Sequence, residues 1–408
     1  MKKYIALLLA LVMVLSMAAC GGAPATPDTP ATPDTPATPN TPATPDTPAT
    51  PDAPAAGPQL SADGRYPAET VKIGFETFTT TDEQFLGIQR YFDYLDDFYN
   101  IEIIYSEALD SAEGEIAFIE QCAAAGCKGI IGYYNVSNEE VVKLCEEKGM
   151  YYWGNGNNTA IVEYGNTTPY YLGSFYVGNA DYEYGYGCVE ALANSGCKKI
   201  ILVSGGAAFG VEMFIDRKAG AEAAAKDFGV EIVYEVPGWP GTEDFSAHQT
   251  NALATDADGI ASMLTALMWI QPLNVAGKFG TVKVAAVDAL NEVVVEMFGA
   301  GMYVGTATEI TDVFGLAVPM ILNAVAGHGE KQRNADGSAL LVDSSWWLVS
   351  GIEEAAYYAS VQGGDSGWAV SIDDMKTILY DFNPELTIED FSALYSAMTM
   401  QEIQARHG

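Results

Sequence analysis

Polar and aromatic side chains follow the short apolar runs of this 408-residue chain, at the points where strands would end. Carboxylates, amides, hydroxyls and flat rings are the groups that hold a small polar ligand by hydrogen bonding and stacking. The chain has no G-x-S-x-G nucleophile motif and no phosphate-binding GxxxxGK[ST] loop. The pattern therefore indicates binding rather than catalysis, with these candidate residues: Thr79, Tyr133, Asn135, Asn155, Trp239, Thr265, Asp288 and Glu309.

The residue types that bind metals are scattered along the sequence. The three histidines, His248, His328 and His407, are isolated from one another and from cysteine pairs. Five cysteines follow Cys20, and no two of them have the C-x-x-C spacing of a zinc or redox site. We therefore expect no metal and no cofactor, and an odd number of cysteines leaves at least one free thiol.

Short apolar runs alternate with helix-length amphipathic stretches after the first seventy residues. The run 71–75 predicts a strand, and 82–98 predicts a helix because Phe85, Ile88 and Phe92 recur at helical spacing. Strand–helix alternation of this kind is typical of parallel sheets built from right-handed βαβ units. The predicted fold class is therefore α/β.

Two segments of similar pattern indicate two similar lobes. Residues 123–134 and 193–204 each end a helix with glycine and continue through Cys-Lys into an apolar strand. The roughly 340 residues that follow the N-terminal region also exceed the size at which one hydrophobic core stops growing. We therefore expect two lobes, each built around its own sheet.

The N-terminal sixty residues are a targeting and spacer region. Lys2 and Lys3 precede an apolar run, which is too short for a comfortable membrane span and is typical of a secretory signal. The string LSMAAC, which ends at Cys20, resembles the lipobox of bacterial lipoproteins, and this resemblance implies that Cys20 is lipid-modified. A plain secretory signal is the alternative. Proline-rich ATPDTP repeats then predict an extended linker over residues 21–66, after the signal peptide 1–20.

The net charge of −35 limits the classes of partner. Few basic residues are available to neutralise phosphates, and they do not cluster, so nucleic-acid binding and electrostatic docking on anionic lipid are disfavoured. The acidity is typical of a soluble, self-repelling surface, with attraction of a cationic ligand as the alternative.

The order of the elements resembles the type I solute-binding proteins of ABC importers, in the branch that includes ribose- and galactose-binding proteins. Four segments carry the resemblance: the strand 71–75 with its polar loop ETFTTTDEQF, the helix and strand of 216–233, the stretch 282–292, whose strand ends in Asp288, and the stretch 303–327. It implies two Rossmann-like lobes joined by a three-crossing hinge, the type I periplasmic binding protein fold.

On this resemblance we expect the first lobe to comprise residues 71–178 and 310–338. The second lobe would comprise 179–309 and 339–370. The remaining segment, 371–408, reads as an extension with two helices, at 372–380 and 387–406, to which the sequence assigns no role.

The resemblance also implies ligand contacts at particular positions. It adds Phe85, in the first polar loop, and Arg217, at the arginine of the second lobe, to the candidates. Asp288 occupies the aspartate position that accepts hydroxyl hydrogen bonds in sugar-binding relatives. Thr265 and Glu309 stand where relatives often have asparagine and glutamine, which weakens the case for a ribose-like ligand.

Each of these residues also has a structural alternative. Asp288 could cap the helix that follows it, and Arg217 could pair with a surface acid such as Glu222. Tyr133 or its neighbour could be a core residue, because adjacent strand residues face opposite sides. Trp239 could anchor its loop.

Taken together, these features predict a monomeric extracytoplasmic receptor that is lipid-anchored to the cell membrane of a Gram-positive type of bacterium. It would capture a small polar solute between its lobes and deliver it to an ABC permease. A sugar is the expected ligand, with a nucleoside or a cationic solute as alternatives. A sensory receptor for a membrane kinase or chemoreceptor, and a cell-surface hydrolase, are the other functions that the sequence allows.

Overall fold

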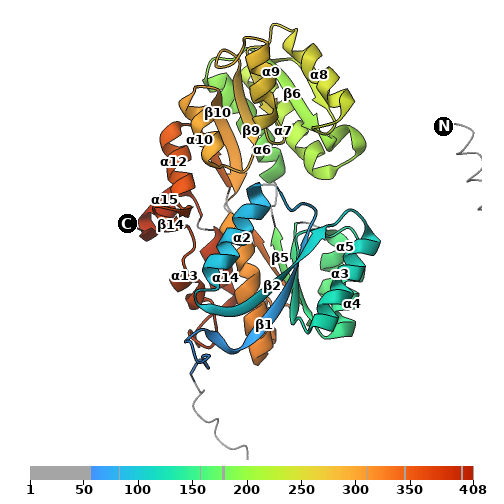
Figure 1. Ribbon diagram of the computed structural model, residues 1–408, viewed down its shortest axis with the longest axis vertical. Helices are drawn as coiled ribbons and strands as arrows, with labels where there is room; N and C mark the ends of the chain where they lie inside the picture. The colour runs from blue at the N-terminus through green and yellow to red at the C-terminus, as the bar shows by residue number, and fades with distance from the viewer. Residues whose placement is uncertain are drawn as a thin grey trace, which may run out of the picture. The chain divides into compact units, whose positions relative to one another are not determined.

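The computed structural model describes residues 57–81, 83–156, 158–176, 180–309, 311–343, 346–396 and 398–407. The signal peptide, Cys20 and the proline-rich repeats lie outside these residues. The described chain forms two six-stranded sheets with helices packed against them, and a two-stranded hairpin near the C-terminus (Figure 1). This arrangement confirms the predicted α/β fold class.

Every strand pair in the first sheet is parallel. In the second sheet all pairs are parallel except β10 with β12. In spatial order the first sheet consists of β11 (Leu340–Asp343), β5 (Tyr171–Tyr176), β4 (Tyr151–Asn155), β3 (Gly129–Gly132), β1 (Tyr66–Thr77) and β2 (Tyr99–Ala108). The second consists of β12 (Trp346–Val349), β10 (Tyr303–Glu309), β9 (Lys283–Val287), β8 (Gly259–Ser262), β6 (Lys199–Gly205) and β7 (Glu231–Pro237).

Helices cover both faces of the first sheet. The apolar stripe of α2 that holds Phe85 and Phe92 packs with Phe75 of β1, whereas α3 and α4 pack on the opposite face (Figure 1). The helices of the first half of the chain are α2 (Glu83–Leu95), α3 (Ala112–Ala125), α4 (Glu140–Lys148), α5 (Thr159–Gly165) and α6 (Ala180–Asn194). Those that follow are α7 (Glu212–Phe228), α8 (Glu243–Leu253), α9 (Ile270–Val275), α10 (Glu292–Gly299), α11 (Ala317–Asn323) and α12 (Ile352–Ser360).

The chain passes between the sheets three times. It leaves the first sheet after β5, returns to it after β10, and leaves again between β11 and β12. We placed residues 339 onward in the second lobe, but β11 pairs with β5, with Leu340 opposite Gly173. The third crossing therefore lies later than predicted, because a short apolar run does not reveal which sheet it joins. The other lobe limits stay predictions.

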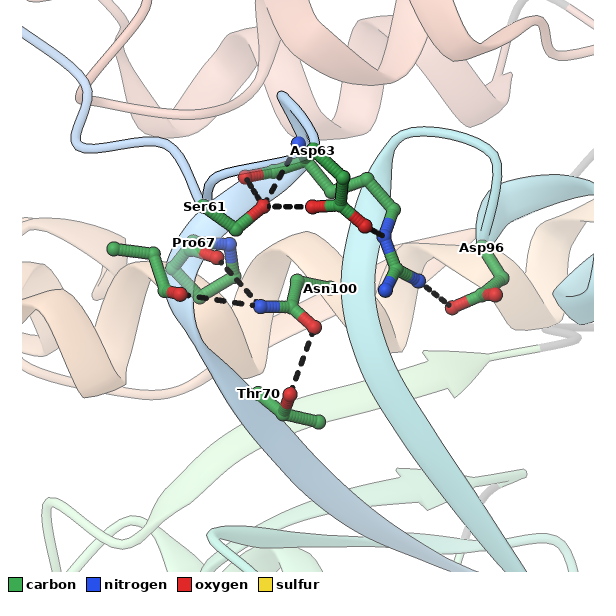
Figure 2. Close-up of polar contacts among 8 residues, drawn as sticks. Ser61, Asp63, Pro67, Thr70, Asp96 and Asn100 are labelled. Atoms are coloured by element: carbon green, nitrogen blue, oxygen red, sulfur yellow. Dashed lines mark hydrogen bonds and ion pairs between the residues drawn. The ribbon is translucent and has the colours of Figure 1, made fainter.

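The first strand begins earlier than the predicted 71–75. Figure 2 shows Asn100 of β2 beside the start of β1, where its amide donates to the carbonyl oxygens of Pro67 (3.1 Å) and Ala68 (3.3 Å). Its side-chain oxygen accepts from Thr70 Oγ1 at 2.8 Å. Tyr66 is buried as well. Strand β1 therefore includes Tyr66, the last residue of the predicted linker 21–66.

The C-terminal segment is more finely divided than the two predicted helices. Residues 371–408 contain three helices, α13 (Ile372–Thr377), α14 (Ile388–Ser396) and α15 (Met400–His407). A hairpin of β13 (Gln362–Gly364) and β14 (Gly367–Trp368) precedes them, within residues that we assigned to the second lobe. The predicted helix 387–406 is interrupted because Thr399 starts a new helix: its hydroxyl accepts from the backbone N–H of Glu402, whose carboxylate accepts from Thr399 N at 3.0 Å.

The segment Thr311–Gln332 is long and apolar enough to cross a membrane by composition, but 72% of its most apolar stretch is buried within the fold. It includes α11, whose residues are all buried. We therefore read it as a core segment that carries the chain back into the first lobe.

A polar cluster lies inside the first lobe, on the side of α3 and α4. Glu76, at the end of β1, has no exposed surface, and neither carboxylate oxygen has a hydrogen-bond partner among the described residues. Glu115 of α3 is also buried, and its Oε2 accepts from the backbone N–H of Ser137 at 2.7 Å. Burial, with the charge of Glu115 adding to it, raises the pKa of Glu76 well above its ordinary value. The fold therefore favours the neutral form of Glu76.

We expect Glu76→Gln to flatten the pH dependence of stability. The folded chain holds the Glu76 proton to higher pH than the unfolded chain does, so the free energy of unfolding should fall as pH rises above the ordinary pKa of 4.5. Chemical denaturation at pH 5 and pH 8 measures this loss, which the variant should lack. The control Glu102→Gln, at an exposed position of β2, should keep it. Parallel pH profiles for wild type and Glu76→Gln would contradict the assignment.

Candidate functional site

A cavity of about 940 Å³ opens where elements of both lobes meet. One side is the polar face of α2, another is the carboxyl ends of β8, β9 and β10, and a third is the end of α12 with the C-terminal hairpin. Ligands in open parallel sheets bind beyond the carboxyl ends of the strands, and this cavity occupies such a position. It is therefore the candidate binding cleft.

Three of the ten predicted residues line this cleft: Arg217, Thr265 and Asp288. The side chain of Glu309 lies outside the described part of the structure. The other six do not line it. Phe85 lies in α2, Trp239 lies in the loop after β7, and four lie at the ends of first-lobe strands: Thr79, Tyr133, Asn135 and Asn155.

Asp288 is held by three donors at the end of β9. Its Oδ2 accepts from Thr265 Oγ1 (2.8 Å), from Tyr303 OH (3.2 Å) and from the backbone N–H of Ala266 (3.3 Å). Burial raises the pKa of Asp288 to about 6, although these hydrogen bonds act in the opposite direction. The alternative that Asp288 caps the next helix is wrong, because Asn291 is the N-cap of α10 and accepts from Val294 N.

Arg217 is fixed by its own lobe. Its Nε donates to Asp181 Oδ1 at 2.7 Å and its Nη1 donates to the carbonyl oxygen of Met263 at 3.0 Å. Helices α6 and α7 approach closely enough for this pair because Gly185 has no side chain: a Cβ there would lie 1.8 Å from the Arg217 carbonyl oxygen. The predicted alternative partner, Glu222, pairs with Lys218 instead.

Phe85 is a core residue, which corrects our expectation of a ligand contact. It is only 2% exposed, and its ring packs against Phe75 and Tyr105, with centroids 6.0 and 5.6 Å apart. Its neighbour Gln84 lines the cleft instead and accepts a hydrogen bond from Tyr133 OH at 2.6 Å. Tyr133 therefore does not line the cleft itself but holds Gln84, which does.

The other first-lobe candidates stabilise loops at the strand ends. Asn135 donates through Nδ2 to the carbonyl oxygen of Asn155 at 2.7 Å, which joins the loops after β3 and β4. Thr79 lies in a turn in which its carbonyl oxygen accepts from Thr77 Oγ1 at 2.6 Å. In the second lobe, Trp239 is 43% exposed and touches Phe214 edge to face, with centroids 5.2 Å apart.

Sequence reasoning missed two groups of cleft residues. The first is the face of α2 formed by Gln84, Gly87 and Arg90, whose spacing of three residues was a usable signal. The second comprises Gln362, Gly363, Gly364 and Trp368 of the hairpin. A short glycine-rich stretch carries no periodic pattern that would have revealed it.

No protein-family model matches this sequence, and a search of curated protein sequences gives no match. Solved structures do match. A periplasmic solute-binding protein of an ABC transporter from Actinobacillus succinogenes 130z, with bound D-allose, is 19% identical with a TM-score of 0.56, covering 70% of this chain and 99% of that one. A solute-binding protein from Bacillus halodurans C-125 with bound myo-inositol is 18% identical with a TM-score of 0.53, covering 74% and 99%.

A third structure is the substrate-binding protein of a sugar ABC transport system from Bordetella parapertussis 12822, 16% identical with a TM-score of 0.55, covering 69% of this chain and 89% of that one. At such identities the likeness shows the fold. This chain therefore has the two-lobed fold of the type I periplasmic binding proteins, as the resemblance in its sequence implied.

Proposed function

We propose that this protein is an extracytoplasmic receptor that binds a sugar or sugar-like solute in the cleft and delivers it to an ABC permease. One observation carries the proposal: the Asp288 carboxylate lines the cleft and is oriented by three donors at the carboxyl end of a buried strand. The bound D-allose and myo-inositol in two structures of this fold support the same class of ligand.

The charges of the cleft favour a neutral polyol. Arg217 is paired with Asp181, and Asp288 is satisfied by neutral donors from its own lobe. Arg90 and Glu83 bring opposite charges from α2. A cleft with both signs of charge suits hydroxyl groups, which donate to carboxylates and accept from guanidinium groups. A nucleoside or a cationic solute is the weaker expectation.

Binding would proceed by closure of the two lobes about the three crossings. A sugar hydroxyl would donate to Asp288, and the exposed ring of Trp239 would supply a flat face for stacking as the lobes approach. Thr79, Asn135, Asn155 and Glu309 stay predicted contacts of the closed state. The role that we assign is binding, with no catalytic residue.

The anchor and the partner belong to the same proposal. Cys20 would carry the lipid, and the proline-rich linker would let the receptor reach a permease in the membrane as a monomer. A sensory receptor that contacts a membrane kinase or chemoreceptor would use the same cleft. A permease gene and an ATPase gene next to the gene of this protein would distinguish transport from sensing.

We expect Asp288→Ala to weaken ligand binding by about 1.5–3 kcal/mol, the value of a hydrogen bond to a charged group. A thermal-shift screen of sugars, nucleosides, amino acids and polyamines first identifies the ligand, and calorimetric titration then measures the affinity of the variant. Ser111→Ala is the control, since it removes the N-cap of α3 and should cost about 1 kcal/mol of stability without changing affinity. Unchanged affinity in Asp288→Ala would contradict the site.

Ligand affinity should also depend on pH. A hydroxyl donates to the ionised form of Asp288, and burial raises the pKa of this residue to about 6. Protonation below that pH replaces the charged acceptor with a weaker neutral one, so affinity should fall, by up to about tenfold, between pH 7 and pH 5. Titration calorimetry across this range tests the expectation. Asp288→Asn should bind more weakly and lose the pH dependence, and a wild-type affinity that is constant from pH 5 to pH 7 would argue against the ionised acceptor.

Cys20→Ala should release the protein from membranes, because a covalent lipid at this residue would be the anchor. Fractionation of cells measures the release, and mass spectrometry of the mature N-terminus identifies the modification. The control Cys127→Ala changes a buried thiol of the first lobe and should leave the protein on the membrane. An unmodified N-terminus at any other residue would rule out the lipoprotein assignment.

A further inference from the structure

The C-terminal hairpin, whose residues we assigned to the second lobe from the sequence, faces the candidate cleft. Gln362, Gly363, Gly364 and Trp368 line the same cavity as Asp288 and Thr265. The positions where Gly363 and Gly364 would carry side chains are filled: a Cβ would lie 2.8 Å from Trp368 Cζ2 in one case and 2.9 Å from Ser360 Cα in the other. The cavity therefore meets their backbone.

A single carboxylate ties the first strand of the hairpin and the segment just after its second strand to the hinge. Asp312, which is completely buried just after the chain crosses back from β10, accepts from Gln362 Nε2 at 3.1 Å and from the backbone N–H of Val370 at 2.8 Å. Gln362 Oε1 in turn accepts from the backbone N–H of Thr311 at 3.2 Å. The hairpin is thus fixed to the crossing segment itself.

Helix α2 packs against the hairpin and the residues that follow it. The indole of Trp368 is 8% exposed and packs on Tyr91 and Tyr94, with ring centroids 4.9 and 5.8 Å apart. Tyr91 OH donates to the carbonyl oxygen of Val370 at 2.9 Å, and Tyr94 OH accepts from the backbone N–H of Ile372 at 2.9 Å. These contacts fix the hairpin against α2 of the first lobe, although we assigned its residues to the second lobe.

The matched solute-binding structures do not account for the whole described chain. The matches span 89–99% of the length of those three structures. The same matches span at most 74% of the length of this chain. Part of the described chain therefore lies outside each match.

We propose that the C-terminal hairpin is a third wall of the cleft and that a bound sugar rests against the Gly363–Gly364 backbone, with Trp368 as the residue that positions it. This inference rests on the proposed function. Peptide N–H and C=O groups without side chains in front of them can approach sugar hydroxyls closely, so the wall would select among sugars by shape and hydroxyl orientation.

Hydrogen–deuterium exchange on the unmodified full chain tests whether a bound sugar covers the hairpin backbone. The probe is the tightest binder among D-allose, myo-inositol, D-arabinose, D-galactose, D-glucose and D-ribose. At saturation, exchange in the peptide spanning 361–368 should slow about fivefold, because the sugar covers its backbone. The peptide spanning 388–396, in α14, should not change, since it does not line the cavity. Equal slowing of exchange in both peptides would mean that the sugar stabilises the whole fold, and this result would contradict the proposal that the hairpin contacts the sugar.

A pair of matched variants tests the positioning role of Trp368. Trp368→Phe should lower affinity about fivefold and change the order of preference among the six sugars. Trp347→Phe is the control, because Trp347 is also buried and donates through Nε1 to the carbonyl oxygen of Met398 in the extension, but does not line the cavity. It should lose stability and keep both affinity and preference.

The outcomes separate the two proposals. Sugar binding that requires Asp288, without protection of 361–368 and without an effect of Trp368→Phe, overturns the wall and leaves the receptor function in place. If Trp368→Phe does not fold, the exchange experiment on the unmodified chain decides. If none of the six sugars binds the unmodified chain, the proposed sugar receptor fails and this inference fails with it.

Discussion

Parallel strands all end at the same edge of a sheet, and this constraint determines where the protein can bind a ligand. Both sheets consist of parallel strands, apart from β12, so the polar residues that follow them gather at two edges. Asp288 and Thr265 come together in this way from the ends of β9 and β8, although 23 residues separate them in the chain. A buried carboxylate needs donors, and neighbouring strand ends supply them.

The same constraint explains which parts of the fold could be predicted from the sequence. Alternating apolar runs and amphipathic helices identify α/β lobes, and the aspartate after the apolar strand 282–287 identifies the strand end. The pairing of β11 could not be predicted in this way. Residues 340–343 are a short apolar run that would suit either sheet, and only contacts between distant segments place them beside β5.

The candidate site was predictable where a residue ends a strand and less so elsewhere. Phe85 illustrates the error: its helical spacing with Ile88 and Phe92, which correctly predicted α2, also placed it on the buried face of that helix. The polar face that lines the cleft carries Gln84 and Arg90 instead. The hairpin could not be predicted, because its position depends on the buried Asp312, some fifty residues away.

The most direct test of this account is a crystal structure of the full chain with the tightest-binding sugar at pH 7. The account predicts the sugar between the lobes, with one hydroxyl within about 3 Å of an Asp288 carboxylate oxygen. A sugar bound elsewhere on the molecule, or held in the cleft without contact to Asp288, would contradict it.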